Sequence, residues 1–224
     1  MADLKNYITS NNVATQDVLR IKVAHEQEGR PKYTQEIKQA LDFIADTERV
    51  ILSNGRWMRF NQDYLEFLDE YIQSIRVEQV ENEFSQVSGG EPEFNVSKAI
   101  KDAGYATADK DFSVFRTRSS TPVEAWDLQK GVCVYAVKFG TAQKLGYVCD
   151  QATAVLELLR NRANVNKVPN FDQYCLWLGY KAKNPVTDIS KSGSIILKQK
   201  IETWARKARE LGIEPVLKIS HKQS

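Results

Sequence analysis

The stretch from Val123 to Leu159 constrains the fold more than any other part of this 224-residue chain. Two apolar segments, Val123–Leu128 and Val132–Phe139, are joined by a short connection in which Gly131 can adopt the positive φ of a tight turn. Leu145–Leu159 then repeats apolar residues every three or four positions, which is typical of a helix packed on a sheet. We therefore predict two neighbouring antiparallel strands followed by a covering helix.

The same kind of pattern continues to the end of the chain. Phe171–Lys181 is apolar and aromatic enough for a central strand, Ser194 is placed to cap a further amphipathic helix, and Glu214–Ser220 is predicted as the last strand. With a helix over 94–103 and a short strand over 112–118, this order of elements favours a mixed β-sheet flanked by helices.

The N-terminal part of the chain carries shorter signals. We predict a strand over Val18–Val23, a helix that begins after Thr34, a hairpin over Arg49–Phe60 and a helix capped by Asn61. Alternating strands and helices of this length indicate a small α/β subdomain.

A polar stretch with two glycines and a proline, Gln86–Pro92, is the best candidate for a linker. The predicted fold class is therefore α+β, with three parts: an N-terminal α/β subdomain over 1–85, a linker over 86–92 and a mixed-sheet domain over 93–224.

Composition excludes several classes of protein. The formal net charge of +2 creates no global field, so any nucleic-acid binding must come from a local patch. The three cysteines lack metal-ligand spacing and the two histidines lie near opposite ends of the chain, which argues against a zinc site. No run of eighteen apolar residues and no signal-peptide pattern is present, so we expect a cytoplasmic protein that does not enter a membrane.

Charged side chains end the two central apolar segments. Asp127 ends the first, Lys138 follows in the second, and Gln151 lies on the next helix. A metal-dependent phosphodiesterase site can be built from such parts: a carboxylate that binds Mg²⁺, a lysine that stabilises charge on the phosphate and an amide that positions water. The alternative is an ion pair at two strand ends, with Gln151 as a polar residue on a helix flank.

This arrangement resembles the restriction-endonuclease-like pattern, in which an Asp is followed by Glu, Asp or Gln, any residue, and Lys. The match is partial, because Ala136 stands where a metal ligand is expected. Positions 136 and 138 share one side of a strand, so an acid at 136 is expected to face the site. Glu93, at a predicted helix start, and Asp109 are candidates for further Mg²⁺ ligands. The preference of acids for helix N-termini explains Glu93 equally well, and a turn explains Asp109.

A basic stretch near the C-terminus, Lys198–Arg209, offers a local patch for nucleic acid. Lys198, Arg206 and Lys207 are the candidate phosphate contacts. Because Glu202 interrupts the stretch, the alternative is the solvated face of an amphipathic helix.

Five short motifs carry a resemblance to a known family. They are Leu52-Ser-Asn-Gly-Arg-Trp57, Glu93-Phe-Asn95, Tyr105-Ala-Thr-Ala-Asp109, Glu124-Ala-Trp-Asp-Leu128 and Tyr135-Ala-Val-Lys138. These motifs are similar to ones in the C-terminal half of a sporadically distributed family of uncharacterised bacterial proteins, often encoded in mobile or phage-defence gene neighbourhoods. The chain departs from that family at Ala136, where the family has His, and at Gly146-Tyr147, where it has Ser-His.

Two functions of different classes remain open at this point. The first is a Mg²⁺-dependent nuclease-like domain of a bacterial antiphage defence protein, acting on nucleic acid. The second is a non-catalytic module that binds a protein or a nucleic acid as a sensor or assembly subunit. The Asp127 and Lys138 pair and the basic helix favour the first function, and Ala136 favours the second.

Overall fold

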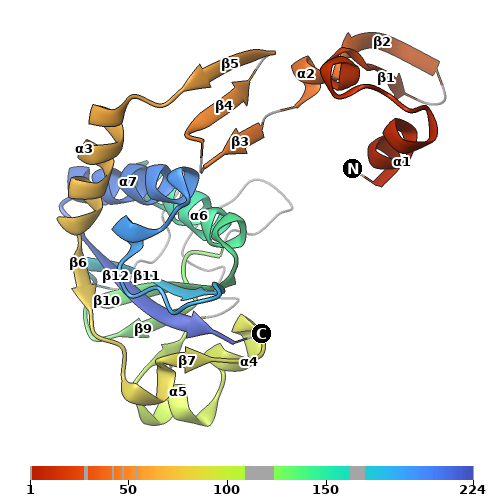
Figure 1. Cartoon of the computed structure of the whole chain (residues 1–224). Helices are drawn as coiled ribbons and strands as arrows, with labels where there is room; N and C mark the ends of the chain where they lie inside the picture. Colours follow the sequence, from red (N-terminus) through yellow and green to blue (C-terminus); the bar gives the residue numbers. More distant parts are fainter. Residues whose placement is uncertain are drawn as a thin grey trace. The chain divides into compact units, whose positions relative to one another are not determined.

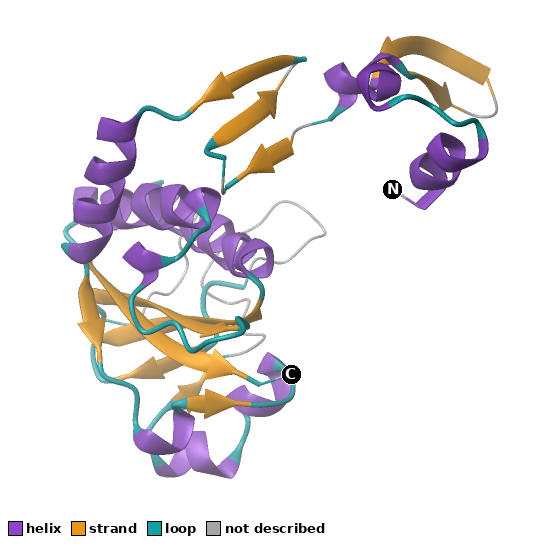
Figure 2. Ribbon diagram, viewed as in Figure 1, coloured by secondary structure: helices purple, strands orange, loops and turns teal. Residues whose placement is uncertain are grey.

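The structure, a computed structural model, describes residues 2–27, 30–41, 43–46, 48–53, 55–108, 124–161 and 170–223. The chain divides into two compact units, Met1–Tyr64 and Leu65–Ser224, and each is described by itself (Figures 1 and 2). No helix within these described ranges is long and apolar enough to cross a membrane.

The first unit is assembled from short elements. Helix α1 (Ala2–Ser10) and a 3₁₀ helix, η1 (Thr15–Arg20), precede an antiparallel pair of strands, β1 (Lys22–Gln27) and β2 (Arg30–Glu36). A single helical turn, α2 (Ile37–Ala40), leads into a three-stranded antiparallel sheet. Its strands are β3 (Phe43–Ala45), β4 (Val50–Ser53) and β5 (Arg56–Arg59).

The hairpin predicted in this unit is confirmed, whereas two other predictions are wrong. β4 pairs with β5 around Gly55, whose φ is +75°. The first half of the strand predicted over Val18–Val23 belongs to the 3₁₀ helix η1 and only its end belongs to β1, and Thr34 lies within β2 instead of capping a helix. A short apolar segment is compatible with a helix and with a strand, so its sequence alone does not determine its conformation. In this unit the pairing of β1 with β2 determines which residues are extended.

The second unit is built on a mixed sheet, which confirms the α+β class. Among the described residues its strand order is β6-β12-β11-β10-β9-β8, and β7 pairs with β12. Strands β10, β11, β12 and β6 are parallel, whereas β9 and β8 are antiparallel to their neighbours. The strands are β6 (Arg76–Glu78), β7 (Gln86–Val87), β8 (Ala106–Thr107), β9 (Leu128–Lys130), β10 (Cys133–Gly140), β11 (Gln173–Tyr180) and β12 (Glu214–Lys222).

Helices cover both faces of this sheet, as Figure 1 shows. Alternate residues of β10, β11 and β12 point to opposite faces, so the sheet supports two apolar cores. One core lies under α6 (Ala142–Arg160) and α7 (Ile195–Glu210), and α3 (Gln62–Gln73) contributes Ile72 to it. The other core involves the shorter elements η2 (Asn82–Phe84), α4 (Glu91–Asn95) and α5 (Lys98–Asp102).

Most long elements of the second unit were predicted correctly. β9 and β10 are antiparallel neighbours joined through Gly131, whose φ is +58°, and α6 follows, although β9 begins at Leu128, the last residue of the strand predicted over Val123–Leu128. Ser194 caps α7, since its Oγ accepts a hydrogen bond from Leu197 N at 3.4 Å. The helix predicted over 94–103 is instead two short helices, because Ser97 caps α5. The strand predicted over 112–118 lies outside the described residues.

The polar stretch 86–92 is structured and lies inside the second unit. β7 pairs with β12, and the backbone of Gln223 donates a hydrogen bond to Val87 O at 3.0 Å. Gly89 has a φ of +69°, and Pro92 occupies the first turn of α4, where a missing N–H costs nothing. The residues that suggested a linker therefore form a turn between a strand and a helix, and the compact units divide at Tyr64 and Leu65.

Candidate functional site

Strand β10 extends beyond the end of its neighbour β9. Because β9 pairs only with Cys133–Tyr135, the later backbone N–H groups on that edge need other acceptors. Asp127 Oδ2 accepts the hydrogen bond of Val137 N at 2.7 Å, and Glu91 Oε1 accepts that of Phe139 N at 2.8 Å. Two carboxylates thus take the place of a pairing strand. Asp127 itself precedes β9 rather than ending a strand, which corrects the prediction.

Lys138 lies between these two amides in the strand. Its Nζ is 3.2 Å from Glu91 Oε1, and its side chain is partly exposed. Burial raises the pKa of Glu91, but hydrogen bonds from the backbone of Phe139 and of Glu91, together with the charge of Lys138, outweigh burial and lower that pKa. The edge of β10 therefore presents a charged lysine and an ionised carboxylate to solvent.

The other oxygen of Asp127 is held by Asn95 at the end of α4. Asn95 Nδ2 donates to Asp127 Oδ1 at 3.2 Å, and the Asn95 side chain is only 1% exposed. Turning the amide over would place its oxygen against the carboxylate, so the observed orientation is the favourable one. Asn95 Oδ1 is consequently a buried acceptor with no hydrogen-bond partner in the described part of the chain. Amide and carboxylate oxygens of this kind are the ligands that Mg²⁺ takes in proteins.

We call Glu91, Asn95, Asp127 and Lys138 the β10-edge cluster. Its two amide donors are two residues apart, so the accepting oxygens are separated by roughly 7 Å at a strand rise of about 3.3 Å per residue. One small ion would contact one carboxylate directly and the other through water, a mode that Mg²⁺ uses because it retains several waters. Among the described residues, no three His, Cys, Asp or Glu side chains are grouped as metal ligands.

The structure brings only part of the predicted site together. Asp127 and Lys138 both lie at the edge of β10, but their contacts differ: Asp127 accepts the hydrogen bond of Val137 N, whereas Lys138 pairs with Glu91. Glu93 does not join them: it is exposed, its carboxylate lies beside Gly90, and Glu91 reaches β10 in its place. Gln151 is exposed on α6. The remaining candidate, Asp109, lies outside the described residues.

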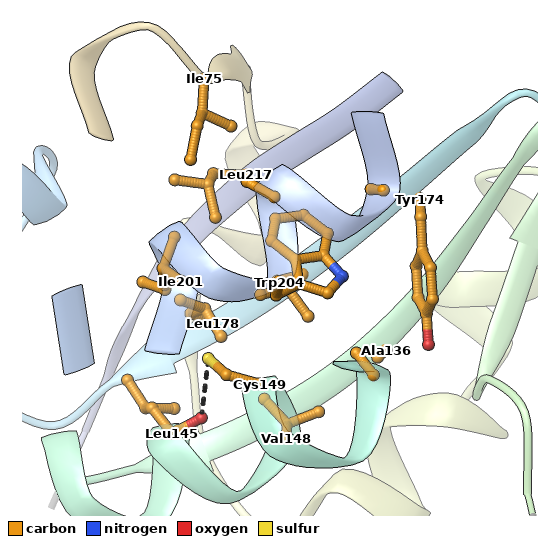
Figure 3. Close-up of a cluster of buried hydrophobic side chains, with 14 of the residues drawn as sticks. Ile75, Ala136, Leu145, Val148, Cys149, Tyr174, Leu178, Ile201, Trp204 and Leu217 are labelled. Atoms are coloured by element: carbon orange, nitrogen blue, oxygen red, sulfur yellow. Dashed lines mark hydrogen bonds between the residues drawn. The ribbon is translucent and has the colours of Figure 1, made fainter. Parts of the chain in front are cut away.

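Position 136 does not face the cluster. Ala136 is buried in the apolar core under α6 and α7, and Figure 3 shows it among Leu145, Val148 and Trp204. The expectation that an acid at this position would reach the site is therefore wrong. Lys138 shares that side of β10, but its long side chain and its place near the strand end let it extend to Glu91.

Residues 1–170 match the model of a family described as a family of unknown function, DUF6119. The chain belongs to this family. The DUF6119 match includes the whole β10-edge cluster and Gln151, and it ends before β11. No curated protein matches the chain. No solved structure matches it either.

The basic residues of α7 lie outside the DUF6119 match and are engaged within the molecule. Lys198 is buried, with its Nζ 2.6 Å from Asp69 Oδ1 and 2.7 Å from Ser190 O. Arg206 pairs with Glu202 and Lys207 with Glu157. Lys198 therefore links α7 to α3, and the charges of the other two predicted nucleic-acid contacts are locally balanced.

Sequence reasoning missed Lys218 on β12, the most deeply buried charge among the residues of the second unit that the structure describes. Its Nζ lies 2.8 Å from a carboxylate oxygen of Glu78, 2.8 Å from one of Glu81 and 2.6 Å from the hydroxyl of Tyr105. It also stands 4.6 Å from the centre of the Trp177 ring. The sequence did contain a signal for this cluster. A lysine within the apolar segment that forms β12 needs oppositely charged partners if its ammonium group is buried.

Proposed function

We propose that the second unit is a Mg²⁺-dependent nuclease-like domain whose site is the β10-edge cluster. The observation that carries the proposal is that Asp127 and Glu91, from two separate segments, both accept backbone hydrogen bonds from one edge of β10, and that Lys138 of this strand pairs with Glu91. The unpartnered oxygen of Asn95 supports it, because a buried acceptor beside a carboxylate suits a hard cation.

In this proposal each residue of the cluster has a distinct role. Asp127 would hold the ion directly, Glu91 would contact it through water, and the Asn95 amide would fix the carboxylate of Asp127. Bound Mg²⁺ would supply Lewis acidity toward the phosphate and an activated water. Lys138, turning from Glu91 toward the substrate, would stabilise the negative charge that develops on the phosphodiester in the transition state.

A role in antiphage defence is the wider part of the proposal. It is supported by the motif resemblance to bacterial proteins encoded in phage-defence gene neighbourhoods. Cells that express the chain should resist phage in a plating assay if this part is correct, and cells that express Asp127→Asn should not.

The test of the nuclease proposal is cleavage of labelled single- and double-stranded DNA and RNA with Mg²⁺ or Mn²⁺. Wild type should cleave at least one of these substrates. Asp127→Asn should abolish cleavage, and Lys138→Gln should lower the rate by about 100-fold or more, as for loss of one group that stabilises transition-state charge. Glu93→Gln is the matched control, because Glu93 is exposed on the same short helix as Glu91.

A second candidate function is a non-catalytic module that binds a protein or a nucleic acid as a sensor or assembly subunit. It is favoured by the hydrogen bonds that Asp127 and Glu91 already accept from β10, since these give both carboxylates a structural role. Under this reading neither wild type nor any variant cleaves nucleic acid, and Asp127→Asn acts only by lowering thermal stability.

A further inference from the structure

The sheet of the first unit carries two large aromatic rings at its surface. Phe43 of β3 and Trp57 of β5 are 50% and 54% exposed. Both are paired in register with Leu52 of β4, so they lie on the same face of the sheet. Their ring centroids are 6.3 Å apart at an interplanar angle of 83°. This edge-to-face contact leaves ring faces uncovered by the partner ring.

A positive charge stands on the same face of this sheet. Arg59 lies two residues after Trp57 on β5, and residues two apart on a strand share a face. Arg59 is exposed and forms no ion pair with any residue that the structure describes. The aromatic rings are therefore accompanied by a guanidinium group that is available to an anionic ligand.

We propose that this aromatic face, defined by Phe43, Trp57 and Arg59, binds single-stranded nucleic acid. Exposed aromatic rings on a sheet accept unstacked bases, and an adjacent arginine neutralises the phosphate backbone, a combination that tolerates any sequence. A duplex keeps its base faces stacked and would bind more weakly. The proposal rests on the first unit alone and does not depend on the nuclease chemistry proposed for the second.

Trp57 provides a selective optical reporter of this face. The chain has four tryptophans, and the other three, Trp126, Trp177 and Trp204, are buried. In the full chain, acrylamide should quench mainly Trp57. Adding oligodeoxythymidine in the presence of EDTA should change this emission and protect it from acrylamide, whereas a Trp57→Phe variant should lose the response.

Fluorescence anisotropy with labelled oligodeoxythymidine tests the residues one by one. Trp57→Ala should weaken binding by about 5- to 150-fold, the effect of losing one stacked base. Phe43→Ala should weaken it in the same direction, and Arg59→Gln should also reduce its salt dependence. Tyr7→Ala is the matched control, because Tyr7 is similarly exposed on α1. A duplex of equal length should bind at least about tenfold more weakly, since its bases are not free to stack.

Three results would overturn the proposal. The first is affinity for oligodeoxythymidine that is the same in wild type, Trp57→Ala and Tyr7→Ala. The second is equal binding of the duplex. The third is a Trp57 that acrylamide cannot reach in the free chain, which would mean that a protein surface covers this face. Binding of oligodeoxythymidine is measured in EDTA, where the metal-dependent site proposed for the second unit cannot act, so an absence of cleavage would count against the nuclease proposal without affecting this one.

Discussion

Replacement of Lys218 by methionine should destabilise the second unit by about 3 kcal/mol. Methionine keeps an unbranched apolar stem beside Trp177 but removes the ammonium group that neutralises Glu78 and Glu81. Removing one partner of a buried ion pair costs about 3–5 kcal/mol, because the other charge stays in a poorly hydrated place. The side chains of Glu78 and Glu81 are 25% and 31% exposed, so partial hydration places the loss near the lower end.

Urea denaturation followed by circular dichroism measures this loss, and the melting temperature should fall by roughly 6–12 °C for a unit of this size. Lys181→Met, at an exposed position after β11, is the matched control and should change stability by less than about 0.5 kcal/mol. The double variant Lys218→Met/Glu81→Gln should recover part of the loss, since it removes one uncompensated charge. Stability of Lys218→Met equal to that of Lys181→Met would refute the reasoning.

The pH dependence of this loss follows from the same contacts. Burial raises the pKa of Glu81, but the hydrogen bond from Lys218 and further hydrogen bonds lower it to about 2 from 4.5. The stabilisation of the folded state by the ionised Glu81 carboxylate is therefore present above pH 4.5 and is lost as the pH falls toward 2. Burial lowers the pKa of Lys218, but hydrogen bonds to Glu78, Glu81 and Tyr105 raise it overall, so its contribution is complete below its ordinary value of 10.5. The stability difference between wild type and Lys218→Met should therefore be flat from about pH 5 to 10 and shrink in acid.

Three further substitutions test the packing of the second unit. Ala136→Glu should lower stability by several kcal/mol without strengthening metal binding, because it buries a carboxylate in an apolar core; a stable variant with tighter Mn²⁺ binding would contradict this. Leu156→Ala should cost about 2–5 kcal/mol in urea denaturation, and an unchanged midpoint would mean that the stripe of α6 is not in the core. Gly179→Ala should cost about 1–3 kcal/mol, since its Cβ would stand 2.3 Å from Phe139 Cδ1. Gly193→Ala, which adds a Cβ in open space, is the control in the same thermal denaturation experiments.

The second unit could be predicted from sequence because its elements carry long, regular signals. The apolar repeat of α6, Leu145–Leu159, covers about four turns, and Gly131 marks the short connection that makes β9 and β10 neighbours. The helices and strands of the first unit are too short to carry such a regular signal. Thr34 precedes apolar residues at helical spacing, Ile37, Leu41 and Ile44, yet the pairing of β1 with β2 places it in a strand.

For the site, the sequence indicated which segments of the chain carry the residues, but not which side chains contact one another. Asp127 and Lys138 could be placed near each other, because Asp127 directly precedes β9 and Lys138 lies on β10, the next strand of the chain. The choice between Glu91 and Glu93 depends on where a five-residue helix begins, which the sequence does not specify. The partners of Lys218 lie 113 and 140 residues away along the chain, so no local pattern joins them.

Binding of Mn²⁺ measured by electron paramagnetic resonance tests the central claim most directly, because it reports the ion at the β10-edge cluster whether or not a substrate is known. Wild type should bind Mn²⁺ weakly, since only two carboxylates contribute. Asp127→Asn should lose this binding while remaining folded, and Glu93→Gln should retain it. Equal binding by wild type and Asp127→Asn, or no binding by wild type, would contradict the assignment of this cluster as a metal-dependent site.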